Sequence, residues 1–119
     1  MSSYIVTIHS PAWSHQSVAT ACEFAEQVIK LNKQLKAIFL YQDGVLNSIQ
    51  SLDIPSDELN GQNKLVQLSK QHQVPILLCA TAAEKRGITP ELVNTHFTFA
   101  GLAEFAELTT DTDHVIQFK

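Results

Sequence analysis

Two patterns of apolar residues follow one another along the sequence. Four short apolar runs predict β-strands, at 4–8, 37–41, 75–79 and 114–118. Between them, apolar residues recur at helical spacing and predict helices at 18–29, 64–73, 80–85 and 101–108. The chain is therefore expected to alternate strands with helices.

Turn-forming residues separate these elements. Ser14 is the candidate N-cap of the first helix, and the polar segment 43–61 is expected to be a long loop with one or two turns of helix. Gly87 is expected to end the helix at 80–85 in a left-handed conformation. A weaker helical stretch is then expected to lead to 97–99.

Strands separated by twenty or more residues that include a helix do not form hairpins, so they are expected to pair in parallel. We therefore expect an α/β fold of three layers, α/β/α, with a mostly parallel open sheet of four to five strands, of the flavodoxin-like kind. A length of 119 residues predicts a single domain over 1–119. In such sheets ligands bind beyond the carboxyl ends of the strands, which directs attention to 10–14, 41–47 and Cys79.

The charge balance argues against direct nucleic-acid binding. Eight Lys plus Arg against twelve Asp plus Glu give a net charge of −4, and Arg86 is the single arginine. A protein that follows a phosphate backbone needs a basic face and guanidinium groups, and this chain offers neither in quantity. Proteins or small molecules are the expected partners.

The sequence has neither a basic leader with an apolar core nor a run of about eighteen apolar residues, so a cytoplasmic location without membrane contact is expected. Cys22 and Cys79 lie far apart and form no CxxC pair. Free thiols in a reducing compartment are the simplest account of them.

Cys79 is the candidate reactive residue. It ends a predicted buried strand and directly precedes the helix at 80–85, where unpaired backbone N–H groups and the positive end of a helix dipole favour a thiolate. The alternative is a small apolar side chain buried at a strand end. Cys22 lies on the apolar stripe of its helix, so core packing is expected for it.

No cofactor or metal is expected. The histidines form no HxH or HxxxH pair and lie near no second cysteine at ligand spacing: His9, His15, His72, His96 and His114. His15 has an alternative reading as a base that approaches Cys79 from the first loop. That loop, from Ser10 to Ser14, lacks the glycines of a phosphate-binding nest, which argues against a flavin.

The sequence also resembles a known family. The stretch LSKQHQVPILLCATAAEKRGI at 68–88 is similar to the region around the active cysteine of the DsrE/TusD sulfurtransferases. Three further pieces agree in the same order, at 10–12, at 39–47, and at 97–102 followed by 115–118. The match covers essentially the whole chain.

The resemblance implies that Cys79 accepts a sulfane sulfur from an upstream carrier protein, holds it as a persulfide and passes it to a downstream carrier. The final product would be 2-thiouridine at the tRNA wobble position. The resemblance also implies related small subunits, TusB-like and TusC-like, in a hetero-oligomer. An acidic chain in such a relay is expected to hand sulfur from protein to protein without touching the tRNA.

Two departures from the family pattern keep alternatives open. Lys85-Arg86 stands where the family often has two arginines, and the segment 109–114 is unusually acidic. A DsrE-type sulfur carrier of sulfur oxidation and a non-catalytic assembly subunit with an inert Cys79 are the alternatives within the family. A flavin-binding electron carrier is the alternative outside it.

Overall fold

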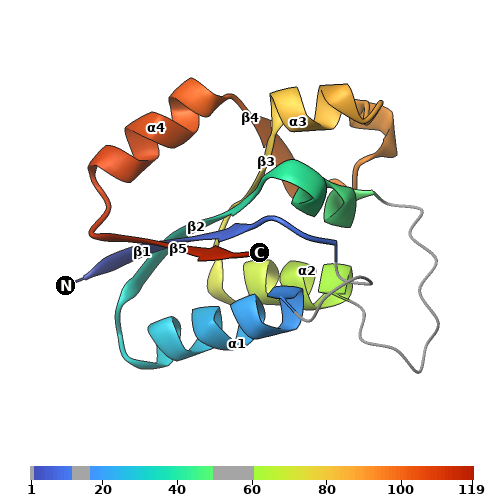
Figure 1. Ribbon diagram of the computed structural model, residues 1–119. Coiled ribbons are helices and arrows are strands. Elements are labelled where there is room, and N and C mark those ends of the chain that lie inside the picture. Colours follow the sequence, from blue (N-terminus) through green and yellow to red (C-terminus); the bar gives the residue numbers. More distant parts are fainter. Residues whose placement is uncertain (1, 12–16, 50–60) are drawn as a thin grey trace.

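The computed structural model describes residues 2–11, 17–49 and 61–119, which form a five-stranded sheet between two layers of helices (Figure 1). The strands are β1 (Ser3–Ile8), β2 (Gln34–Leu40), β3 (Ile76–Cys79), β4 (Phe97–Ala100) and β5 (His114–Phe118). They lie in the order β4-β3-β2-β1-β5, and all four neighbouring pairs are parallel. The predicted three-layer α/β class with a parallel sheet is confirmed.

The helices divide between the two faces of the sheet. Figure 1 shows α1 (Ser17–Lys30) and α2 (Gly61–His72) on one face, with α3 (Ala80–Lys85) and α4 (Leu102–Thr110) on the other. Two 3₁₀ helices, η1 (Gln42–Ser48) and η2 (Pro90–Leu92), follow β2 and α3. No helix in the described ranges is both long and apolar enough to cross a membrane.

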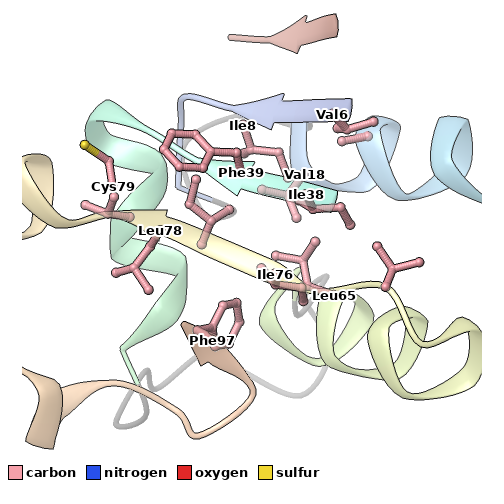
Figure 2. Close-up of a cluster of buried hydrophobic side chains, with 14 of the residues drawn as sticks. Val6, Ile8, Val18, Ile38, Phe39, Leu65, Ile76, Leu78, Cys79 and Phe97 are labelled. Atoms are coloured by element: carbon pink, nitrogen blue, oxygen red, sulfur yellow. The ribbon is translucent and has the colours of Figure 1, made fainter. Parts of the chain in front are cut away.

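The main core lies between the sheet and the pair α1 and α2. The parallel register places Val6, Ile38 and Ile76 side by side, and all three are buried. Figure 2 shows them together with Val18 and Leu65, which come from the two helices. Burial of branched apolar side chains on this face stabilises the fold by about 1.5–3 kcal/mol for each residue.

An aromatic pair attaches α4 to the opposite face. The ring of Phe39 on β2 stacks on the ring of Phe105, with centroids 4.2 Å apart and an angle of 24° between the planes. Phe39 is buried, whereas Phe105 is half-buried and Leu102 of the same helix is exposed. This stacked pair packs helix α4 against the sheet.

The predicted strand at 37–41 has different bounds in the structure. Strand β2 begins at Gln34 because a register shift between Tyr4 and Ile5 extends the pairing past the polar Lys36. It ends at Leu40, and the left-handed backbone at Gln42, with φ of 51°, follows directly. The apolar run alone indicates neither end.

The other differences are small. Strand β3 begins at Ile76 rather than Pro75, and the helical stretch expected after Pro90 is reduced to the three residues of η2, after which 97–100 is a strand. Gly87 has the predicted left-handed conformation, with φ of 70°. The candidate N-cap Ser14 and most of the expected loop at 43–61 lie outside the described residues.

Candidate functional site

Cys79 joins strand β3 to helix α3. It is the last residue of the strand and the N-cap of the helix, with φ of −66° and ψ of 117°. Its Sγ accepts a hydrogen bond from the backbone N–H of Ala82 at 3.4 Å, as an N-cap side chain does toward the third residue of a helix. The predicted placement of this thiol, at a strand end before a helix, is confirmed.

The thiol of Cys79 has no exposed surface, because the residue is 0% exposed. Figure 2 shows its sulfur at the margin of the labelled apolar cluster, on the side of the green ribbon of η1. Helix η1 packs against both β3 and α3. A reagent or partner therefore reaches this sulfur only after some neighbouring group moves.

A pocket of about 310 Å³ lies next to the buried thiol. Its wall is formed by the residues that follow β2, by α3 and by the start of α4: Tyr41, Gln42, Thr81, Ala82, Lys85, Arg86 and Leu102. Ala82 contributes to this wall and also donates to the sulfur of Cys79. The pocket therefore borders the backbone that holds the thiol.

Arg86 ties the two sides of this region together. Its Nε and Nη2 both lie 2.9 Å from Oδ1 of Asp43 in η1, and its Nη1 donates to the carbonyl of Ala82 at 3.0 Å. The guanidinium therefore joins η1 to the backbone that holds Cys79. Lys85 and Arg86 also place two cationic side chains on the pocket wall.

His9, just beyond β1, extends the site toward a third strand. Its Nδ1 lies 3.0 Å from Oε1 of Gln42, and its Nε2 lies 3.0 Å from Oγ1 of Thr7. Because Oε1 only accepts, this contact is a hydrogen bond in the tautomer of His9 that carries the proton on Nδ1. The carboxyl ends of β1, β2 and β3 thus contribute to one connected region, as expected for an open parallel sheet.

Close contact with β1 holds η1 in place. A Cβ on Gly44 would lie 2.1 Å from the carbonyl oxygen of Ile8, so only glycine allows this approach. The buried side chain of Asn47 donates to the carbonyls of Ser10 and Gly44, each at 3.0 Å. The segment that carries Gln42 and Asp43 is therefore fixed against the sheet.

The sequence of the chain matches a known protein family. The sequence model of the DsrE/DsrF-like family matches residues 1–118. The chain belongs to the DsrE/DsrF-like family. The family predicted from the motifs around Cys79 is confirmed.

Curated relatives in this family carry a sulfur-transfer name. The chain is 34% identical to the sulfurtransferase TusD homolog of Haemophilus influenzae, over 95% of this chain and 97% of the relative. It is 33% identical to the sulfurtransferase TusD homolog of Vibrio cholerae, over 97% and 96% of the two chains. The predicted sulfurtransferase class is thereby confirmed.

The fold is also shared with a solved structure. The crystal structure of the ychN protein from Escherichia coli superposes with a TM-score of 0.85, covering 99% of this chain and all of the other, at 23% sequence identity. This similarity supports the fold predicted for a member of the DsrE/DsrF-like family.

Cys22 and His114, also considered from the sequence, lie away from the site. Cys22 is buried in the groove between α1 and α2, and burial raises the pKa of its thiol to about 11. His15 lies outside the described residues, and His114 stacks on Tyr4 at the far end of β1. Among the described residues, no three His, Cys, Asp or Glu side chains are placed to share a metal ion.

Sequence reasoning missed two polar residues of this region. Gln42 falls inside the strand-end segment 41–47, but nothing marked its side chain as part of a site. His9 directly precedes the strand-end segment 10–14 and stood outside it. The signal that could have found it is the same strand-end rule, with the segment after β1 begun at His9 rather than at Ser10.

Proposed function

We propose that this chain is a sulfur-relay subunit that accepts a sulfane sulfur on Cys79, holds it as a persulfide and passes it to a downstream carrier protein. The observation that carries the proposal is the position of Cys79 at the N-cap of α3, with the N–H of Ala82 donating to its sulfur at 3.4 Å. Family membership supports sulfur as the group transferred.

The proposed reaction is two successive exchanges. The Cys79 thiolate attacks the outer sulfur of a donor persulfide, a new S–S bond forms, and the donor leaves as a thiolate. In the second step an acceptor thiolate attacks the outer sulfur on Cys79, and Cys79 leaves as a thiolate. The N–H of Ala82 favours both steps, since it donates to a sulfur that bears negative charge when it attacks and when it leaves.

The pocket supports the proposal because a persulfide needs room for one more atom than a thiol. Sγ of Cys79 is fully buried, and the pocket of about 310 Å³ borders Thr81 and Ala82, the second and third residues after it. The outer sulfur would lie in this pocket, and the cysteine of a carrier protein would enter it.

The proposed partners are proteins. Upstream and downstream sulfur carriers supply the two thiols that the exchange needs, and TusB-like and TusC-like subunits are the proposed companions in a hetero-oligomer in the cytoplasm. The relatives named TusD support this setting, with 2-thiouridine at the tRNA wobble position as the proposed end product. The net charge of −4 argues against direct contact between this chain and the tRNA. In this proposal the chain acts as a single domain.

The test is sulfur loading followed by peptide mass spectrometry. The protein is incubated with cysteine persulfide, and the added sulfur is located after proteolysis. We expect one extra sulfur on the peptide that contains Cys79, unchanged loading in Cys22→Ser and none in Cys79→Ser. Loading of Cys79→Ser to the level of the natural protein would contradict the proposal.

A non-catalytic assembly subunit is the second candidate, and the complete burial of Cys79 favours it. In that case iodoacetamide at neutral pH would leave Cys79 unlabelled in the folded protein, and cysteine persulfide would add no sulfur to it. Labelling of Cys79 under native conditions would instead support the relay.

A further inference from the structure

Gln42 has a backbone conformation that its residue type rarely adopts. Its φ of 51° lies in the left-handed region, although Gln has a Cβ and is not among the residues that favour this region. Such conformations persist where the surroundings impose them, and they are concentrated at functional sites. Here the conformation accompanies a side chain on the wall of the pocket that Thr81 and Ala82 also line.

His9 fixes the orientation of the Gln42 amide. Nδ1 of His9 donates to Oε1 of Gln42 at 3.0 Å, while Nε2 of His9 meets the hydroxyl of the buried Thr7 at the same distance. With Oε1 engaged by His9, the Nε2 group of Gln42 retains two N–H donors. Within the described ranges, no acceptor is bonded to those donors.

We infer that Gln42 contacts the transferred sulfur, with its amide Nε2–H donating to the outer sulfur of the persulfide on Cys79, and that His9 is the positioning residue for this amide. The inference rests on the proposed function and adds to it a donor from the second strand end. Ala82 serves the inner sulfur and Gln42 serves the outer one. No bond is made or broken by either residue.

The chemistry of the outer sulfur explains why a neutral donor suits this position. A deprotonated persulfide carries its negative charge on the outer sulfur, and an N–H donor on the pocket wall stabilises that charge, although the side chain of Gln42 is exposed. Lys85 on the same wall favours an anion there, whereas the charge of Arg86 is paired with Asp43. A neutral amide adds to the stabilisation of this anion. Because the amide carries no charge, it does not form a tight ion pair with the sulfur that would resist transfer.

The decisive variant is Gln42→Glu, which keeps the shape of the side chain and replaces the donor by a carboxylate. After loading with cysteine persulfide, we expect the lifetime of the sulfur on Cys79 to fall by about tenfold, the size of effect expected when a hydrogen bond to a charged atom is lost. Iodoacetamide labelling of unloaded Cys79 in the same variant measures what the added negative charge does to the thiol itself, and the fall in persulfide lifetime should exceed that effect. Gln34→Glu makes the same change at the opposite, exposed end of β2 and should alter neither quantity.

Variants of His9 separate positioning from general loss of structure. The amide of His9→Asn places an N–H near the position of Nδ1, so we expect it to keep most of the persulfide lifetime, whereas His9→Phe should shorten it as Gln42→Glu does. Gln42→Gly removes the donor and also suits a left-handed backbone, so it tests the same point in a chain that folds without strain at this position.

The outcomes distinguish the two levels of the proposal. If the natural protein takes up no sulfur on Cys79, the proposed function fails. If the natural protein takes up sulfur on Cys79, the proposed function stands. If both Gln42→Glu and Gln42→Gly then hold the sulfur for as long as the natural protein does, the role of Gln42 is overturned.

Discussion

The guanidinium of Arg86 joins the helix that Cys79 caps to the 3₁₀ helix that follows β2, through two contacts of 2.9 Å to Oδ1 of Asp43. The same side chain donates to the carbonyl of Ala82, whose N–H donates to the thiol. We therefore expect the stability of this connection to affect how easily the buried sulfur becomes accessible.

Loss of the Asp43 charge should expose Cys79 more often. We expect Asp43→Asn to increase the native-state rate of iodoacetamide labelling at Cys79 by about two- to fivefold, since a half-exposed ion pair contributes about 0.5–1 kcal/mol. The free energy of unfolding in urea should fall by no more than about 1 kcal/mol. Glu84→Gln, which removes an exposed carboxylate from α3, is the matched control. Equal labelling of Asp43→Asn and the natural protein would show that this pair does not control access.

Gly44 should tolerate no side chain. A Cβ there would lie 2.1 Å from the carbonyl oxygen of Ile8, so Gly44→Ala should lower the free energy of unfolding by more than about 2 kcal/mol. Gly101→Ala is the control: its Cβ would meet only Oε1 of Glu104 at 3.9 Å, and the expected loss is below about 1 kcal/mol. Urea denaturation of both variants checks this, and equal losses would contradict the close approach of η1 to β1.

Cys22 should make the fold less stable at alkaline pH. Burial raises the pKa of its thiol from 9.0 to about 11, so between these values the folded chain binds a proton that the unfolded chain has lost. The contribution of the neutral Cys22 thiol to the free energy of unfolding is fully present below about pH 9. It falls as the pH rises toward 11, and the total loss is roughly 2–3 kcal/mol. Denaturant unfolding across this range, compared between the natural protein and Cys22→Ala, isolates the effect. Parallel pH curves for the two proteins would contradict it.

Asp113 should contribute to stability at neutral pH and not in acid. The backbone N–H of Ser3 donates to its Oδ2 at 2.9 Å and holds the pKa of this carboxyl below its usual value. Because folding lowers this pKa, the stabilisation is fully present when the pH is above the pKa of the carboxyl in the unfolded chain. It is lost as the pH falls through the pKa of the carboxyl in the folded chain. Asp113→Asn should therefore lower the melting temperature at pH 7 and differ less from the natural protein near pH 3, while Asp111→Asn should have little effect at either pH. A difference that is the same at both values would rule out the carboxylate as its source.

The fold was predictable because its signals are local and repeated. Apolar runs such as 75–79 and the helical spacing of 18–29 each reflect one element, and the spacing between strands indicates parallel pairing. The start of β2 was not predictable, because Gln34 and Lys36 are polar, and Lys36 is the residue that the pairing skips at the register shift between Tyr4 and Ile5.

The position of Cys79 was predictable for a related reason, since a strand end before a helix can be read from neighbouring residues. The link between His9 and Gln42 spans 33 positions and depends on the register of β1 against β2. Glutamine carries no sequence signal for a left-handed backbone, in contrast to glycine. The polar surroundings of the thiol therefore required the structure.

The burial of Cys79 bears on how long a loaded sulfur would survive in a cell that is rich in small thiols. A persulfide on an open surface would be reduced by any thiol that diffuses to it, whereas the inner sulfur of a persulfide on Cys79 is buried and its outer sulfur would be open only through the pocket beside Ala82 and Arg86. A carrier protein that fills this pocket as it docks would exclude other thiols while the sulfur is transferred. Delivery to the correct recipient would thus be favoured by the shape of the entrance.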